Sequence, residues 1–172
     1  MMNLTTEKNN DIAKIRTVLI DAFGRENEGV LVEKIRNSPN FISELSLVAK
    51  EDENILGYIL FSPITIATET QITKAIALAP LAVKPAYQNQ GIGSNLVKFG
   101  LERCRELNHN IIVVLGEPEY YERFGFQTAS KFNIFAPFPV PDEAFMIIHL
   151  ISDQLLHNIS GTVQYPAYFN EV

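Results

Sequence analysis

The residues best suited to chemistry lie at positions 81–94, which read LAVKPAYQNQGIGS. A strand pattern ends within this segment, a polar turn follows, and an apolar helical pattern starts at Gly91. Gln88, Gly91 and Gly93 form Q-x-x-G-x-G. The first-turn amides of a helix have no intrahelical partner and carry partial positive charge, and glycine lets an anion approach them. The segment therefore predicts a cradle for a phosphate or pyrophosphate.

Two other phosphate-binding motifs do not fit this segment. A P-loop requires Gly-Lys-Ser/Thr, but the chain reads Gly93-Ser94-Asn95 and has no lysine there. The dinucleotide fingerprint G-x-G-x-x-G, counted from Gly91, needs its third glycine where Leu96 stands. The loop therefore indicates an anion site of another kind.

Composition limits the class of protein. The 172 residues fit one domain with a sizeable core, and 47% hydrophobic with 20% charged residues is typical of a globular chain. The formal net charge of -6 argues against sequence-independent binding to nucleic acid, which needs a basic surface. The same charge is compatible with a cationic partner.

The cysteine and histidine content and the apolar runs bear on the cellular compartment, on membrane insertion and on metal binding. Cys104 is the sole cysteine, so we expect no internal disulfide and a cytoplasmic setting. The N-terminus, MMNLTTEKNND, lacks the apolar core of a signal peptide, and the longest apolar run, residues 75–83, is too short to cross a bilayer. We therefore expect no membrane partner, and scattered histidines predict no metal site.

Hydrophobic periodicity and turn residues predict the secondary structure. The expected helices are residues 10–23, 30–36, 91–107 and 118–124. The expected strands are residues 45–50, 55–61, 72–83, 111–115 and 145–151. The first three strands form an antiparallel meander, and the all-apolar fourth strand indicates a parallel pair with the third. Pro63 is expected at an edge, a bulge or a break, because it cannot donate to a strand ladder.

This order of elements resembles the GNAT superfamily of acyl-CoA-dependent N-acetyltransferases. The resemblance rests on Q-x-x-G-x-G at the start of a helix and on YYERFGF at residues 120–126. The longer segment LGEPEYYERFGF, residues 115–126, is similar to a branch of small bacterial members.

The resemblance implies a particular α/β fold. It implies a single domain over residues 1–172, with an N-acetyltransferase core at 4–151 and a C-terminal extension at 152–172. The core is expected to hold a mixed, mostly antiparallel sheet flanked by helices. A V-shaped splay is expected between the strands that end near Val83 and Leu115.

The resemblance also implies acetyl-CoA as the co-substrate. In the family its pyrophosphate lies on backbone amides of the Q-x-x-G-x-G loop, and its pantetheine arm pairs with the strand before that loop. The arm maps onto Leu81, Ala82 and Val83. The pyrophosphate maps onto Gln88, Asn89, Gln90, Gly91, Ile92, Gly93 and Ser94.

The family pattern F/Y-Y-x-x-x-G-F assigns the chemistry to Tyr121. A phenol near the sulfur of CoA supplies a proton to the departing thiolate as a general acid. Without the motif, a half-buried aromatic residue is the simpler interpretation. Many members carry a glutamate base on the third meander strand, and KAIALAPLAV has no carboxylate. Glu117, Glu26 and Glu28 are candidates, and a water chain or deprotonation in solution would serve without them.

The resemblance thus implies N-acetylation of a primary amine, with a non-catalytic acyl-CoA-binding sensor or regulatory module as the alternative. The acceptor stays open between small-molecule and peptide amines. Family members often pair through C-terminal strands, so a homodimer is also open. The segment FAPFPVP, residues 135–141, either walls an acceptor pocket or packs as a loop. His149 and Cys104 are expected in packing roles.

Overall fold

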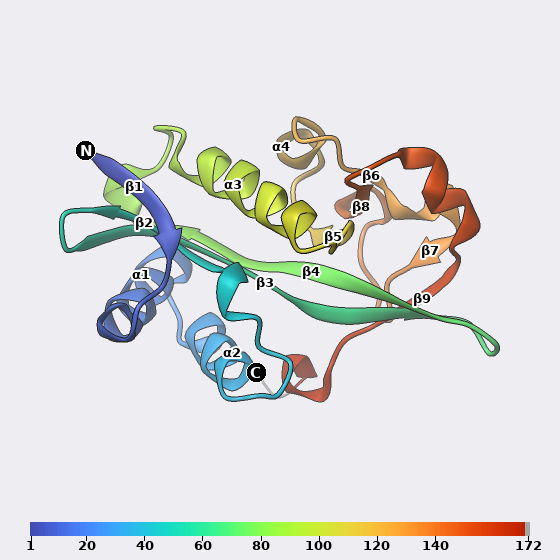
Figure 1. Ribbon diagram of the computed structural model, residues 1–172, viewed down its shortest axis with the longest axis horizontal. Coiled ribbons are helices and arrows are strands. Elements are labelled where there is room, and N and C mark those ends of the chain that lie inside the picture. Colours follow the sequence, from blue (N-terminus) through green and yellow to red (C-terminus); the bar gives the residue numbers. More distant parts are fainter. Residues whose placement is uncertain (171–172) are drawn as a thin grey trace. The chain divides into compact units, whose positions relative to one another are not determined.

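The computed structural model describes residues 1–170 (Figure 1). These residues form two compact units. The first unit comprises Met1–Ser62, Ala79–Arg103 and the C-terminal residues from Ala167. The second unit comprises Pro63–Leu78 and Cys104–Pro166. Strands β3 and β4 each pass from one unit into the other, so the boundary crosses elements of the sheet.

Within residues 1–170, nine strands form one hydrogen-bonded order, β1-β2-β3-β4-β5-β8-β6, with β9 paired to β3 and β7. The strands are β1 Met2–Thr6, β2 Ser46–Glu51, β3 Asn54–Ala67, β4 Ile72–Val83, β5 Ile111–Leu115, β6 Gln127–Thr128, β7 Ile134–Phe135, β8 Phe145–His149 and β9 Gly161–Gln164. The α-helices are α1 Ile12–Phe23, α2 Asn27–Arg36, α3 Ile92–Glu106 and α4 Pro118–Glu122. Pairs β4–β5 and β7–β9 are parallel, whereas β1–β2, β2–β3, β3–β9, β5–β8 and β6–β8 are antiparallel.

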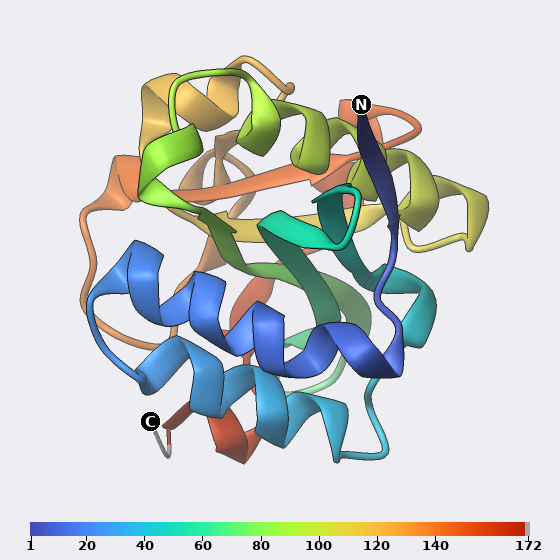
Figure 2. The same cartoon turned by 90° about the vertical axis from the view of Figure 1, so that its left-hand side faces the viewer.

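The first unit places helices on both faces of its strands. Helices α1 and α2 lie on one side, and α3 lies on the other (Figure 2). The apolar stripes of α1 and α2 bury a common cluster against β2, β3 and the end of β4. Its buried members are Ile15, Val18, Leu19, Leu31, Val32, Ile35, Val48, Ile55, Tyr58, Leu60 and Ala82. The short 3-10 helix Ala167–Asn170 adds Tyr168 and Phe169 to the edge of this cluster.

Two glycines let α3 lie close against the strands of the same unit. A Cβ built on Gly57 of β3 would lie 3.0 Å from Cδ1 of Leu96 and 3.2 Å from Cγ2 of Ile92. A Cβ built on Gly100 in the middle of α3 would overlap the ring of Phe61. Both positions therefore need glycine because of space, although neither has a positive φ.

Replacing Gly100 by alanine tests this contact. Glycine inside a helix usually costs about 0.5–1 kcal/mol relative to alanine, so Gly→Ala is usually stabilising there. Here the new methyl group meets the Phe61 ring, and overpacking should lower the free energy of unfolding by about 1–3 kcal/mol. Chemical denaturation measures the change. Gly29→Ala in α2 is the control, because its Cβ would meet only the Arg16 side chain at 3.4 Å. A more stable G100A protein would contradict the close contact.

Buried ion pairs hold the N-terminal segment of the first unit. Asp11 is fully buried, and its carboxylate lies 2.8 Å from Nζ of Lys50. It also accepts a hydrogen bond of 2.8 Å from the amide of Lys8. Arg36 of α2 donates from two nitrogens to the carboxylate of Glu7, each at 2.8 Å. These contacts fix the chain on either side of the turn that leads from β1 into α1.

The Asp11 pair predicts a loss of stability at low pH. Burial alone raises the pKa of Asp11, but Lys50 and the Lys8 amide outweigh it and hold the pKa below the ordinary value of 3.8. The folded state therefore gains stability from the ionised group above that ordinary value, and loses it as the pH falls through the lowered pKa.

Asp11→Asn should lower the free energy of unfolding by about 1–3 kcal/mol at pH 7, because Lys50 loses a buried partner. The difference from the unmodified chain should shrink below the ordinary aspartate pKa, where the native carboxylate also protonates. Urea denaturation at a series of pH values measures both effects. Asp21→Asn, an exposed change on α1, is the matched control. A difference that stays constant down to strongly acidic pH would contradict the buried pair.

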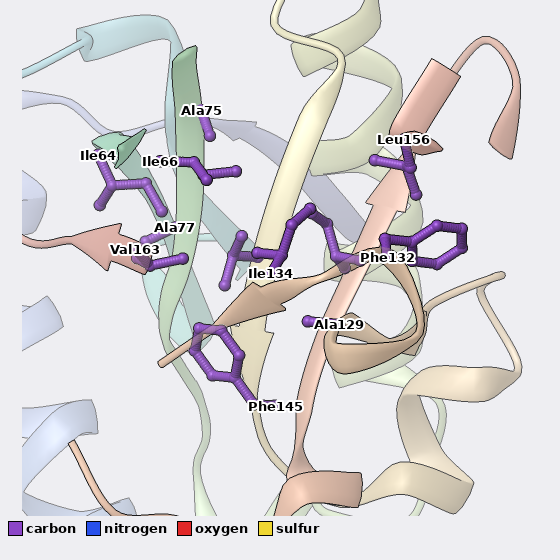
Figure 3. Packing of buried hydrophobic residues seen from close by; sticks show 12 residues of the cluster. Ile64, Ile66, Ala75, Ala77, Ala129, Phe132, Ile134, Phe145, Leu156 and Val163 are labelled. Atoms are coloured by element: carbon purple, nitrogen blue, oxygen red, sulfur yellow. The ribbon is translucent and has the colours of Figure 1, made fainter. Parts of the chain in front are cut away.

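The second unit has a core of its own. Side chains from β3, β4, β5, β7, β8 and β9 pack together with those of two 3-10 turns (Figure 3). The buried members are Ile64, Ile66, Ala75, Ala77, Val113, Ala129, Phe132, Ile134, Phe145, Ile147, Leu156 and Val163. The all-apolar strand β5 pairs in parallel with β4 through Ile76–Ile112 and Ala77–Val113, as its sequence predicts.

The structure extends some predicted elements and adds others. Strand β3 continues past Pro63 to Ala67. Its pairs with β2 end at Leu60 and its pairs with β9 begin at Thr65, so Pro63 lies between these two ladders. Helix α2 begins at Asn27 rather than at residue 30. Strands β1, β6, β7 and β9 were not predicted, and β9 gives the C-terminal extension a place in the sheet.

Candidate functional site

The loop at residues 84–91 carries β4 directly into α3 within the first unit. The amide of Lys84 donates to the carbonyl of Leu56 at 2.9 Å and holds the end of β4 on β3. Nε2 of Gln88 donates to the carbonyl of Val83 at 3.1 Å, so this side chain ties the loop back to the strand. Asn89 and Gly91 have φ values of 63° and 84°, which reverse the chain before the helix.

The start of α3 presents backbone donors beside an open surface. The amide of Asn95 makes the first intrahelical bond, 3.0 Å to the carbonyl of Gly91. The amides of Ile92 and Gly93 therefore precede the hydrogen-bonded ladder of the helix. Gly91 is exposed, and a Cβ built on it would meet nothing within 4 Å. A set of N–H donors at a helix N-terminus with free space before it fits an anionic group such as a pyrophosphate.

The strand before this loop alternates in burial. Ala82 is buried in the cluster with α1 and α2, whereas Leu81 and Val83 are half-buried. Successive strand residues point to opposite faces, so Leu81 and Val83 share the face away from that cluster. The three residues predicted for the pantetheine arm thus lie immediately before the loop predicted for the pyrophosphate.

Tyr121 lies on α4 in the second unit and is packed among aromatic rings. Only 8% of it is exposed. Its ring meets those of Tyr120 and Phe126 edge to face, with centroids 5.0 and 5.6 Å apart. Burial, with a smaller contribution from Tyr120, raises the pKa of the Tyr121 phenol above its ordinary value of 10.0. The hydroxyl is therefore protonated at neutral pH and able to donate.

Gly116 leaves the space that the Tyr121 ring occupies. It follows β5, and its amide donates to the carbonyl of Ala144 at 3.0 Å. A Cβ built on Gly116 would overlap the ring of Tyr121. Sequence reasoning missed this residue. The available signal was a glycine between an all-apolar strand and a helix that starts with Pro118.

The backbone of α4 explains the rest of the YYERFGF segment. The carbonyl of Glu117 accepts from the amides of Tyr120 and Tyr121 at 3.2 and 3.1 Å. The carbonyl of Tyr121 in turn accepts from Phe124 at 3.0 Å. Gly125 then takes a φ of 100°, which residues with a Cβ rarely adopt, and turns the chain into β6.

The three candidate carboxylates differ in their surroundings. Glu28 accepts two hydrogen bonds from Arg25, at 3.0 and 2.5 Å, and Glu26 pairs with Arg16 at 3.4 Å. Both therefore have arginine partners within the first unit. Glu117 is exposed, precedes α4 and lies in the same unit as Tyr121.

Other reactive residue types have structural roles. Nδ1 of His149 accepts from the amides of Ile151 and Ser152 at 3.2 and 3.4 Å, and burial lowers the pKa of this imidazole. Cys104 is buried on α3, which raises the pKa of its thiol to about 12. Arg123 lies over the ring of Tyr120, 4.6 Å from its centroid.

Two further findings concern absences within residues 1–170. No group of three or more histidine, cysteine, aspartate or glutamate side chains there is arranged to hold a metal ion. No helix in that range has both the length and the apolar character needed to cross a bilayer.

Comparison with known proteins places the chain in a family. Residues 43–128 match the family model described as "Acetyltransferase (GNAT) domain". The Escherichia coli K12 protein named "Uncharacterized N-acetyltransferase YhbS" is 34% identical over 161 residues, which is 93% of each chain. The chain belongs to the GNAT family of N-acetyltransferases. The E. coli K12 protein named "Uncharacterized N-acetyltransferase YjhQ" is 36% identical over 134 residues, 77% of this chain and 74% of its own.

Two solved structures of GNAT proteins have a similar fold over almost the whole chain. YhbS from E. coli, crystallised in complex with CoA, gives a TM-score of 0.89 at 32% identity and covers 98% of this chain and 92% of its own. A GNAT acetyltransferase from Brucella melitensis, in complex with acetyl-CoA, gives 0.78 at 32% identity and covers 98% of both chains. The predicted family and the mixed, mostly antiparallel sheet flanked by helices are confirmed.

Gly116→Ala tests how the GNAT chain seats Tyr121. The added methyl group overlaps the ring, so we expect the ring to shift and the free energy of unfolding to fall by about 1–3 kcal/mol. Chemical denaturation measures the second effect, and aromatic proton chemical shifts, compared with a Tyr121→Phe protein, measure the first. Glu119→Ala on the exposed side of α4 is the control. Unchanged ring resonances in the G116A protein would contradict the packing.

Proposed function

We propose that this GNAT protein transfers an acetyl group from acetyl-CoA to a primary amine, by direct attack in a ternary complex. The observation that carries the proposal is the start of α3, where backbone donors lie before the helix ladder, beside an exposed glycine at the end of β4. Two structures at 32% identity, in complex with CoA and with acetyl-CoA, support the same co-substrate.

In this proposal, acetyl-CoA is bound mainly by backbone atoms. The pyrophosphate would lie on the loop formed by Gln88, Asn89, Gln90, Gly91, Ile92, Gly93 and Ser94. The pantetheine arm would pair with the backbone of Leu81, Ala82 and Val83, as an added strand does. The side chain of Gln88 supports this arrangement because its bond to Val83 joins the two parts.

The chemistry needs one proton donor from the chain. Bound acetyl-CoA supplies an acetyl thioester, which the neutral amine attacks with formation of a C–N bond and loss of the C–S bond. Tyr121 gives its phenolic proton to the departing sulfur and regains a proton from solvent. Burial raises the pKa of Tyr121.

The amine must also lose a proton, and the base that accepts this proton is less well defined than the acid. Glu117 is our candidate because it lies four residues before Tyr121 on the same turn and has an exposed side chain. It would accept the ammonium proton directly or through water. Deprotonation in solution remains the alternative, since β4 carries no carboxylate.

The acceptor is a primary amine of a small molecule or a peptide. A cytoplasmic setting is part of the proposal, supported by a single cysteine whose thiol is buried. Pairing of two copies through C-terminal strands also stays a prediction, which light scattering of the purified chain tests.

Tyr121→Phe tests the proposed acid. Removing the hydroxyl should lower kcat about 10- to 100-fold, because solvent replaces the acid poorly, and should leave the KM for acetyl-CoA within about twofold. Release of free thiol from acetyl-CoA with a panel of primary amines measures the rate. Tyr120→Phe is the matched control, since it removes the neighbouring hydroxyl and keeps the ring.

Two results would overturn parts of this proposal. An unchanged kcat in the Y121F protein would remove Tyr121 from the acid role. Tight calorimetric binding of CoA, with no thiol release for any amine, would select the non-catalytic acyl-CoA-binding module instead.

A further inference from the structure

The last residues of β4 have one edge that no strand covers. The last pair of β4 with β5 is Ala77–Val113, and within residues 1–170 no strand pairs with this edge beyond it. The opposite edge lies on β3, because the amide of Lys84 donates to the carbonyl of Leu56 at 2.9 Å. Backbone groups on an uncovered strand edge are the ones that an added strand pairs with.

The carbonyl of Val83 points to this uncovered edge. In a planar trans peptide the carbonyl and the following amide point in opposite directions. The Val83–Lys84 peptide is trans, and its amide points to Leu56 on β3. The carbonyl of Val83, the last residue of β4, therefore points away from β3. It is the acceptor that an added ligand would meet first on leaving the loop.

A side chain of the loop occupies this acceptor in the structure. Nε2 of Gln88 donates to the carbonyl of Val83 at 3.1 Å. A glutamine carboxamide offers the same kind of N–H donor as a backbone amide. Gln88 is exposed, so its side chain can leave the carbonyl without opening the core. The side chain thus makes the bond that a secondary amide of a ligand would make at this edge.

The loop has backbone bonds that do not depend on this side chain. The amide of Tyr87 donates to the carbonyl of Lys84 at 2.8 Å. The amide of Gln88 donates to the carbonyl of Pro85 at 3.4 Å. Both bonds persist when the carboxamide of Gln88 moves, because neither uses its atoms. Loss of the carboxamide bond therefore uncovers the Val83 carbonyl and leaves these loop bonds in place.

We propose that the carboxamide of Gln88 competes with the pantetheine arm of acetyl-CoA for the carbonyl of Val83. A secondary amide of the arm donates to this oxygen only after the side chain has left it. An exposed hydrogen bond of ordinary strength would then reduce the affinity for the arm about two- to tenfold. The place of the arm on β4 rests on the proposed function, and the opposing role of the Gln88 side chain goes beyond it.

Gln88→Met tests the competition, because methionine has a similar length and no N–H donor. One probe is S-acetylpantetheine, which has the arm without the phosphates, and the other is ADP, which has a pyrophosphate without the arm. In NMR titrations of the full chain, Q88M should bind S-acetylpantetheine about two- to tenfold more tightly than the unmodified chain, and ADP no more tightly. Gln71→Met, the same change at an exposed glutamine between β3 and β4, is the matched control and should alter neither affinity.

Gln88→Asn gives a second variant that keeps the carboxamide. Its side chain is one methylene shorter and no longer reaches Val83, so it should bind S-acetylpantetheine as Q88M does. A side chain that only orders the loop predicts the opposite sign, with weaker binding of both probes. Weaker or unchanged binding of S-acetylpantetheine by both variants would overturn the competition. Tighter binding of both probes would also overturn it, because it would show a reshaped loop.

The side-chain amide resonance of Gln88, identified by its loss in Q88M, reports the exchange directly. S-acetylpantetheine should shift this resonance in the unmodified chain. An analogue with both arm amides N-methylated has no N–H donor, so it should leave the resonance in place and bind about tenfold more weakly. Equal shifts with both compounds would contradict an exchange of donors at Val83.

Acetyl transfer separates this inference from the proposed function. Displacement of the Gln88 side chain by S-acetylpantetheine, with no thiol release from acetyl-CoA for any primary amine, would overturn the function and support the competition. Thiol release by a chain whose Gln88 resonance does not move when acetyl-CoA binds would overturn the competition and leave the function in place. A chain that binds neither compound would overturn both.

Discussion

The close approach of α3 to β3 is the contact on which the cofactor side of this protein depends. Gly57 and Gly100 leave room for Leu96 and Phe61, and no larger residue fits at either position without movement. Because the helix lies this close to the strands, its first turn comes directly after β4 with only a short loop between. The backbone donors of that turn therefore stay beside the end of the strand whose backbone is proposed to bind the rest of acetyl-CoA.

The second unit also depends on a glycine that leaves space for a neighbouring side chain. Gly116 has no Cβ where the ring of Tyr121 lies, and the rings of Tyr120 and Phe126 hold that ring edge to face. The hydroxyl is thus presented from a packed aromatic cluster rather than from a free side chain. The burial that fixes the ring is also what raises its pKa, so the same packing sets both the position and the protonation of the proposed acid.

The sequence predicted the strands around the loop before α3 well because the relevant signals are local. Strands β4 and β5 have the predicted bounds, since turn residues flank continuous apolar runs. The turn from β4 into α3 could be predicted because a few neighbouring residues determine its backbone. Strands β6 and β7 have two residues each, which is too short for any period, and β9 follows a segment without a pattern. Helix α2 begins among polar residues that resemble a turn, so its start was placed too late.

The acceptor side could not be predicted for a related physical reason. An acceptor pocket takes its walls from side chains that are far apart in the sequence, and only folding brings these together. Backbone donors recognise a phosphate with almost any side chains around them, whereas the shape of a side-chain pocket changes with every residue in its wall. Two GNAT proteins that are each 32% identical to this chain were crystallised with CoA and with acetyl-CoA, whereas no local motif in this sequence identifies the acceptor. Recognition by backbone donors thus leaves a local pattern in the sequence, whereas recognition by side-chain volume does not.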